Sequence, residues 1–128
     1  MKKRRVAVIG AGPGGLAAAR YLQSEQFEPV VFEKGDRLGG QWSGDPAHSG
    51  VWPGMRTNTS RIMTAVRDLP HCANSPTYLT SQAMAEYLQR YAELFELTSR
   101  IRRVKFVVTK IPAGSFEPIT GKSDSGKW

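Results

Sequence analysis

Three glycines near the start of the chain have the spacing of a dinucleotide-binding loop. Gly10, Gly12 and Gly15 form a G-x-G-x-x-G whose middle positions are Pro13 and Gly14. In such a loop the first glycine permits a tight turn, the second lets a pyrophosphate approach the backbone, and the third lets a helix pack closely against a strand. The pyrophosphate lies against free N–H groups at the helix N-terminus, where the helix dipole favours negative charge. The chemistry expected here is therefore the binding of a dinucleotide.

An acidic residue stands where such a loop requires one. Glu33 follows Gly15 at close to the roughly 20-residue spacing of dinucleotide-binding units, and it ends a second apolar run over 30–32. Its carboxylate can accept hydrogen bonds from the adenosine ribose hydroxyls, and it would repel a 2′-phosphate. The glycines and this acid together predict that the unit binds FAD or NAD and does not bind NADP.

The elements that must position these residues are also present in the sequence. An apolar run over 6–9 precedes the glycines, and an alanine-rich amphipathic stretch separates them from the run over 30–32. This order of strand, helix and strand is the context that supports a glycine motif. It predicts an α/β fold of the Rossmann-like FAD-binding type, with a parallel sheet and flanking helices.

The first 19 residues also have features of a secretory signal. A basic start at 2–5 is followed by an uncharged stretch over 6–19 that ends in three alanines. Glycines and a proline interrupt the middle of this stretch, where they would break a signal helix, and the stretch is too short to span a bilayer. We therefore interpret the basic start as a solvated lead-in to the first strand, and we expect a cytoplasmic protein without a membrane partner.

Composition narrows the classes of protein further. The 128 residues, 40% of them hydrophobic, suffice for one domain with a real core. Cys72 is the single cysteine, which excludes an internal disulfide and a C-x-x-C redox pair. A net charge of +7 could favour nucleic acid, but the basic residues are scattered and have few aromatic neighbours. We therefore expect no nucleic-acid partner.

The segment over 34–54 is predicted to be a loop, because glycines and prolines recur in it without a sustained period. Its glycine pair, Gly39 and Gly40, would permit another close backbone approach to a dinucleotide. His48, in the same segment, is a candidate polar ligand to a cofactor, but we interpret it as an ordinary surface histidine.

A helix is predicted over 81–97, where apolar residues recur at helical spacing, with Thr80 or Ser81 as the N-cap. Its apolar stripe is expected to lie in the core and to carry no chemistry. The stripe consists of Met84, Tyr87, Leu88, Tyr91, Leu94 and Phe95.

A β-rich stretch is predicted over 101–111.

Three stretches resemble the N-terminal part of flavin-containing monooxygenases, with Baeyer–Villiger monooxygenases as near relatives. GAGPGG with Glu33 resembles their FAD fingerprint, and LGGQW at 38–42 is similar to their segment of a glycine pair and a tryptophan. MRTNTSR at 55–61, followed by DLP at 68–70, resembles the segment that brings an asparagine beside the flavin ring. The cofactor-binding residues that this resemblance implies are Gly10, Gly12, Pro13, Gly14, Gly15, Glu33, Lys34, Leu38, Gly40, Gln41, Trp42, Thr57 and Asn58.

The resemblance also implies a function. The enzyme would use FAD, NADPH and O₂ to oxygenate a small nucleophilic or ketone substrate, and the protein would orient the cofactor and keep its surroundings dry. Asn58 would be the catalytic residue, hydrogen bonding near the flavin through both ends of its amide. An asparagine in a T-N-T-S run can instead serve a turn through bonds from its side chain to the backbone.

The sequence departs from this family after about residue 111. It contains no second G-x-G-x-x-G, and none of its phenylalanines begins the F-x-G-x-x-x-H monooxygenase signature. We therefore expect residues 1–128 to be a truncated N-terminal part of an FAD-binding domain, with the NADPH-binding domain absent and no activity alone. The sequence also fits two alternatives. One is a fragment of an FAD-dependent amine oxidase or desaturase, because GDRLGGQ matches those enzymes equally well; the other is an inactive dinucleotide-binding module.

Overall fold

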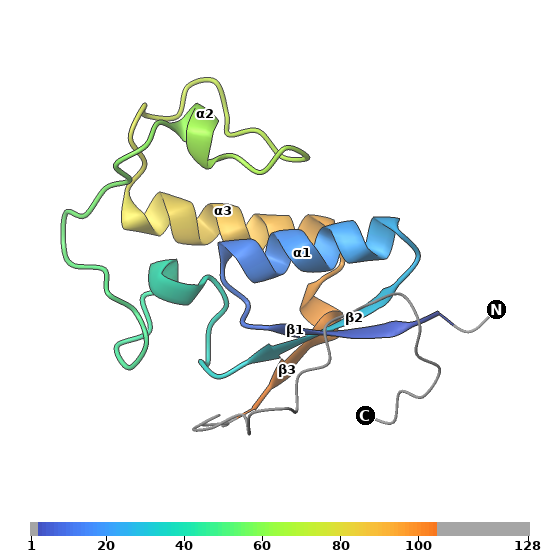
Figure 1. Ribbon diagram of the computed structural model, residues 1–128. Helices are drawn as coiled ribbons and strands as arrows, with labels where there is room; N and C mark the ends of the chain where they lie inside the picture. The colour runs from blue at the N-terminus through green and yellow to red at the C-terminus, as the bar shows by residue number, and fades with distance from the viewer. Residues whose placement is uncertain (1–2, 105–128) are drawn as a thin grey trace, which may run out of the picture.

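The computed structural model describes residues 3–104. Two strands and the helix between them come first, an irregular region with two short helical turns follows, and a long helix leads to a third strand (Figure 1). In chain order these elements are β1 (Arg5–Ile9), α1 (Pro13–Ser24), β2 (Glu28–Glu33), η1 (Gly40–Trp42), α2 (Arg61–Thr64), α3 (Ser81–Leu94), η2 (Thr98–Arg100) and β3 (Ile101–Arg103).

The three strands form one parallel sheet in the order β1-β2-β3. Val31 in the central strand pairs with Val8 on one side and with Ile101 on the other. Figure 1 shows α1 and α3 lying side by side over the same face of this sheet. The α/β fold with a parallel sheet and helices, predicted from the sequence, is confirmed.

The core lies between the sheet and the two long helices. Val8 and Val31 point from the strands toward the helices, and Leu16 and Leu88 meet them from α1 and α3. Strand alternation sends the intervening side chains to the opposite face, and there Ile9 is 80% exposed among the described residues. One side of the sheet is thus packed by α1 and α3, and the other side presents apolar side chains.

The long helix α3 begins where the sequence predicted. Thr80 is its N-cap, and the Thr80 side chain accepts a hydrogen bond of 3.1 Å from the amide of Ala83. The helix ends at Leu94, three residues before the predicted end, because Glu96 takes a left-handed conformation with φ 56°. Most of the predicted stripe is in the core, as expected, with Met84, Tyr87, Leu88 and Tyr91 buried.

Leu94 corrects one part of that prediction, since it is 58% exposed. It lies at the edge of the stripe, about 100° around the helix from the row of Leu88 and Phe95. Phe95, just beyond the last turn, packs against the core instead.

The segment over 34–54 is mostly irregular, as predicted, but it contains the short turn η1; the short helix α2 lies between this segment and α3. At the other end of the described chain, β3 covers only the first part of the predicted β-rich stretch, and residues 105–111 lie outside the described residues. None of the helices within residues 3–104 is long and apolar enough to cross a membrane.

Candidate cofactor-binding site

The first and third glycines of the fingerprint are required by the path of the backbone. Gly10 has φ +93°, in the left-handed region that side chains disfavour, and its amide donates to the carbonyl of Phe32 at 2.7 Å. A Cβ atom at Gly15 would overlap the carbonyl oxygen of Gly10 and lie 3.0 Å from its carbonyl carbon. Helix α1 therefore packs against strand β1 as closely as the glycine motif predicts.

The N-terminus of α1 presents free backbone donors. Gly12 is the N-cap, Pro13 is the first helical residue, and no side chain of residues 3–104 caps the helix. The first helical hydrogen bond joins the amide of Leu16 to the carbonyl of Gly12 at 3.0 Å. The amides of Gly14 and Gly15 therefore have no acceptor within the helix. With no acidic residue in the first turn, this end of the helix is suited to an anionic group such as a pyrophosphate.

The glycine pair after β2 packs against the fingerprint loop itself. The amide of Gly39 donates to the carbonyl of Ala11 at 2.8 Å, and a Cβ atom at Gly40 would lie only 3.1 Å from the Cα of Gly12. The sequence predicted a close approach at this pair but assigned it to the dinucleotide. The structure shows that the pair brings two loops of the protein together.

Glu33 is buried at the end of β2, with 6% of its surface exposed. One carboxylate oxygen, Oε2, accepts a hydrogen bond of 2.6 Å from the amide of Ala11, and Oε1 accepts one of 2.7 Å from the amide of Gly35. Each oxygen keeps a second lone pair that a ribose hydroxyl could use. Glu33 thus joins the fingerprint loop to the turn after β2 and keeps its acceptors pointed at the space between them.

These loops enclose a cavity of about 670 Å³, within the usual size range of small-molecule and cofactor sites. Its polar side is formed by Gly10 and Gly12, by Glu33 and Lys34, and by the loop around Gly40. Its apolar side is the sheet face away from the helices, lined by Ala7, Ile9, Phe32 and Val104.

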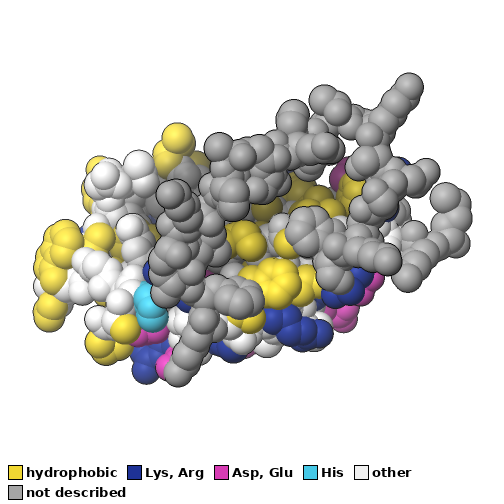
Figure 2. Space-filling model, turned by 60° about the horizontal axis from the view of Figure 1, so that its bottom comes forward, with side chains coloured by type: hydrophobic (Ala, Val, Ile, Leu, Met, Phe, Trp, Pro, Cys, Tyr) yellow, Lys and Arg dark blue, Asp and Glu magenta, His cyan; other side chains and the backbone are white. Residues whose placement is uncertain are grey.

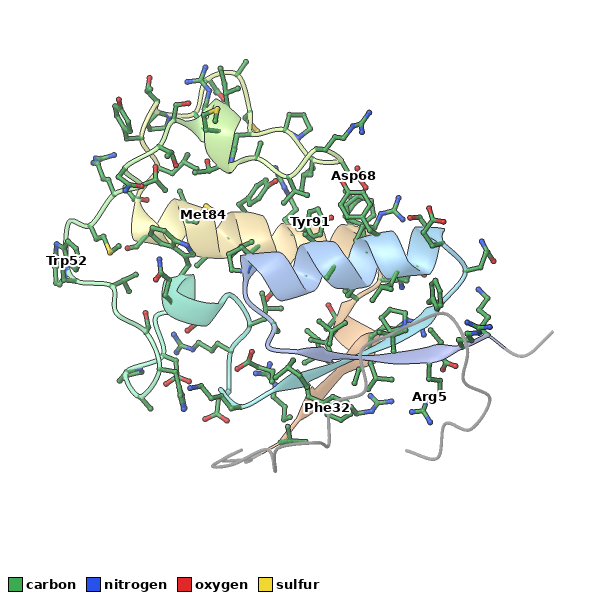
Figure 3. The ribbon with its side chains drawn as sticks, in the orientation of Figure 1. Arg5, Phe32, Trp52, Asp68, Met84 and Tyr91 are labelled. Atoms are coloured by element: carbon green, nitrogen blue, oxygen red, sulfur yellow. The ribbon has the colours of Figure 1, made fainter. Side chains whose placement is uncertain are left out.

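Figure 3 shows Phe32 projecting from β2 on the side opposite α1 and α3. Figure 2 brings this side of the molecule forward and shows hydrophobic side chains gathered in the middle, with basic side chains near them.

The structure brings some predicted cofactor residues to the cavity and leaves others outside it. Gly10, Gly12, Glu33, Lys34, Gly40 and Gln41 line the cavity. Leu38 is buried in the core and Trp42 packs against the core. The remaining predicted residues are not among those that line it, namely Pro13, Gly14, Gly15, Thr57 and Asn58.

Asn58 is exposed, and its neighbour Thr57 is 5% exposed. The Thr57 hydroxyl donates to the carbonyl of Thr59 at 2.8 Å and accepts from the amide of Leu79 at 3.0 Å. The amide of Thr57 donates to the carbonyl of Leu79 at 2.9 Å. Thr57 therefore ties the Asn58 segment to the residues just before α3, a role that the sequence did not indicate.

The chain beyond Asn58 is fastened to the middle of α3 through Tyr87. The Tyr87 hydroxyl donates to the carbonyl of Leu69 at 2.6 Å and accepts from the amide of Val66 at 2.7 Å. The ring of His71 lies 4.0 Å from that of Tyr87, centre to centre. Burial lowers the pKa of His71 below its usual value, and the positive charge of Arg90 lowers this pKa further.

Two residues that the sequence did not predict as site residues, Asp45 and His48, also line the cavity. The carboxylate of Asp45 lies 3.2 Å from Nδ1 of His48. Hydrogen bonds from the amide of Ala47 and from His48 hold the pKa of Asp45 below its usual value. A D-x-x-H in a glycine-rich loop has no spacing that singles it out, because its position depends on how the loop folds back onto β2.

The chain is similar in sequence to flavin-dependent monooxygenases. The profile of a family described as flavin-binding monooxygenase-like matches residues 3–128. Flavin-containing monooxygenase 5 of Oryctolagus cuniculus is 33% identical over 132 residues, which cover 100% of this chain and 24% of that protein. Dimethylaniline monooxygenase [N-oxide-forming] 4 of Homo sapiens is 30% identical over 129 residues, which cover 98% of this chain and 22% of that protein. The chain thus spans about a quarter of the length of these relatives.

The fold is similar to those of solved monooxygenase structures. S-allyl-L-cysteine S-oxygenase from Allium sativum has a TM-score of 0.68 and 28% identity, with 80% of this chain and 28% of that chain covered. An oxidized steroid monooxygenase bound to NADP has a TM-score of 0.68 and 27% identity, with 80% of this chain and 19% of that chain covered.

Proposed function

The chain belongs to the flavin-binding monooxygenase-like family, and on that premise we propose that it forms the FAD-binding part of a flavin-dependent monooxygenase. The proposed enzyme uses FAD, NADPH and O₂ to oxygenate a small nucleophilic or ketone substrate. Membership of this family favours a monooxygenase over the amine oxidases and desaturases that the GDRLGGQ stretch also resembles.

We assign residues 1–128 to the N-terminal part of the FAD-binding domain and place the NADPH site outside these residues. The sequence contains a single G-x-G-x-x-G, and it matches about a quarter of the length of the curated relatives. Both observations support the assignment, since a second dinucleotide normally requires a second binding unit.

One observation carries the proposal of FAD binding. The buried carboxylate of Glu33 and Gly12, the N-cap of α1, line the same cavity. FAD fits this donor set, because its pyrophosphate requires backbone N–H groups and its adenosine ribose requires an acceptor. The amides of Gly14 and Gly15, which follow the cavity-lining Gly12 in the first turn of α1, would hold the pyrophosphate, and Glu33 would accept from the ribose hydroxyls.

Bound FAD would supply the redox chemistry that activates O₂. The residues of this chain would bind the cofactor, orient it and exclude water from it. We propose Asn58 as the catalytic residue, with its amide donating to and accepting from groups at the flavin ring. The hydrogen bonds of Thr57 to Thr59 and Leu79 support this role, because they fix the backbone on which Asn58 stands.

Titration of FAD into the purified chain, followed by flavin fluorescence, tests the proposed binding. Glu33→Gln should weaken binding by on the order of 1–3 kcal/mol, since it removes a hydrogen-bonded charge at the ribose position. Asp36→Asn is the matched control. It removes an equal charge from an exposed neighbour that does not line the cavity, so its FAD affinity should equal that of the unsubstituted chain. Equal affinity in all three proteins would contradict the assignment of Glu33.

A further inference from the structure

A second carboxylate, that of Asp45, is built into the wall of the nucleotide cavity. Asp45 is 9% exposed. Its Oδ1 accepts a hydrogen bond of 2.9 Å from the amide of Ala47, and its Oδ2 lies 3.2 Å from Nδ1 of His48 and 3.4 Å from the amide of Asp36. The amide of Asp45 itself donates to the hydroxyl of Ser43 at 3.2 Å. The loop after η1 is therefore folded around this side chain.

The carboxylates of Asp45 and Glu33 approach the same glycine, Gly35. A Cβ atom at Gly35 would be 3.1 Å from Oδ2 of Asp45 and 3.2 Å from Oε1 of Glu33. Both acids also line the cavity. The end of β2, where an adenosine ribose is expected, is thus flanked by two carboxylates and not by one.

Both carboxylates accept hydrogen bonds from backbone N–H groups. Glu33 accepts two backbone N–H bonds, and the hydrogen bonds to Asp45 keep its pKa low. Lys34 and Arg37 line the cavity as well, but within residues 3–104 neither forms an ion pair with either acid. The guanidinium of Arg103 also lies close by, because it donates to the carbonyl of Gly35. Among the residues that line the cavity, Glu33 and Asp45 are the acids.

We propose that Asp45 is a specificity-determining residue of the nucleotide site, which together with Glu33 admits an adenosine with free ribose hydroxyls and rejects one that carries a 2′-phosphate. The inference rests on the proposed function and deepens it. The proposed enzyme uses two dinucleotides that differ at this position, since FAD has a free 2′-hydroxyl and NADPH a 2′-phosphate. Two anions at the ribose would keep NADPH out of the FAD site. His48 is a positioning residue that holds the carboxylate of Asp45 toward the cavity.

The test compares two ligands that differ only by the 2′-phosphate, adenosine 5′-monophosphate and adenosine 2′,5′-bisphosphate. The dissociation constant of each is measured by competition against FAD bound to the purified chain. The dissociation constant of the bisphosphate divided by that of the monophosphate measures discrimination against the extra phosphate. A general loss of affinity affects both constants equally and cancels in this ratio. Asp45→Asn should lower this ratio about tenfold, the effect of one partly screened charge at short range.

Two further variants make the result decisive. Asp36→Asn is the matched control, because it removes the same charge from an exposed side chain outside the cavity, and it should leave the ratio unchanged. Asp45→Ser repeats the test if Asp45→Asn does not fold, since a serine hydroxyl can still accept from the amide of Ala47.

The possible outcomes separate this inference from the proposed function. A ratio that falls in the Asp45 variants and not in Asp36→Asn supports the inference. A ratio equal to that of the unsubstituted chain in folded Asp45 variants that still bind FAD overturns the inference and leaves the proposed function intact. A chain that binds neither FAD nor adenosine 5′-monophosphate overturns both.

Discussion

One added methyl group should have three different effects at three neighbouring glycines of the fingerprint. In Gly15→Ala the new Cβ would overlap the carbonyl oxygen of Gly10 and lie 3.0 Å from its carbonyl carbon. Both are backbone atoms, so β1 and α1 would have to move apart by on the order of 1 Å, and overpacking of this kind costs about 1–3 kcal/mol. Alanine recovers less than about 1 kcal/mol through its higher helix propensity. We expect a net loss of about 2 kcal/mol in the free energy of unfolding.

The other two substitutions serve as controls for one another. No atom lies within 4 Å of a Cβ at Gly14, so Gly14→Ala should stabilise the fold by about 0.5–1 kcal/mol through helix propensity alone. At Gly12 the new Cβ would be 3.6 Å from the Cα of Gly40, an ordinary contact that leaves stability nearly unchanged. Gly12→Ala should nevertheless weaken FAD binding by more than about tenfold, because the methyl group narrows the cavity wall between Gly12 and Gly40, where the pyrophosphate must approach the backbone.

Urea unfolding followed by far-ultraviolet circular dichroism gives the stability of each variant, and FAD titration gives its affinity. We expect Gly14→Ala to be the most stable of the three variants, Gly12→Ala the next and Gly15→Ala the least, with the binding defect of Gly12→Ala present in a fully folded protein. A Gly15→Ala variant as stable as Gly14→Ala would refute the close approach of β1 and α1. An unchanged FAD affinity in Gly12→Ala would refute the pyrophosphate position.

Four more results are expected. In a form of the protein that also carries a nicotinamide site, Asn58→Ala should keep FAD but divert NADPH consumption toward hydrogen peroxide; normal coupling would return Asn58 to a turn role. Thr57→Val should destabilise the chain by about 1–3 kcal/mol, because the buried amide of Leu79 loses its acceptor, whereas Thr57→Ser should restore stability. His71, whose pKa is lowered in the folded state, binds fewer protons there than in the unfolded chain, so stability should fall as pH drops below about 6.5; His71→Asn should flatten that dependence in denaturant titrations. Residues 1–128 alone should show no substrate-stimulated oxidation of NADPH, and a measurable rate would overturn the placement of the NADPH site outside them.

The elements around the fingerprint could be predicted because their signals are local. The apolar runs before Gly10 and before Glu33, and the 3.6-residue period of the stripe in α3, depend only on neighbouring positions in the sequence. Thr80 was recognisable as an N-cap for the same reason. These signals determine strands, helices and their order, which is enough to place the end of β2 beside the N-terminus of α1.

The contacts of the loop between β2 and α3 could not be predicted from such local signals. Asp45 reaches the cavity only because its loop folds back against Gly35, and no periodicity records that return. Thr57 was assigned to the cofactor from a family resemblance, while its hydrogen bonds to Leu79 join residues 22 positions apart. Such contacts are decided by tertiary packing of polar groups that must find partners once buried.

The double attachment of Glu33 limits how this chain could change its nucleotide preference during evolution or in the laboratory. Sites that accept a 2′-phosphate have a basic residue near this position, so the direct route would replace Glu33. Here that replacement would also release the amides of Ala11 and Gly35, which hold the fingerprint loop to the turn after β2. Unless the new side chain binds both amides, the altered protein would lose stability before it gained a new ligand. A change of nucleotide preference would first require another acceptor for the amides at the turn around Gly35. Glu33 could then be replaced without loss of stability.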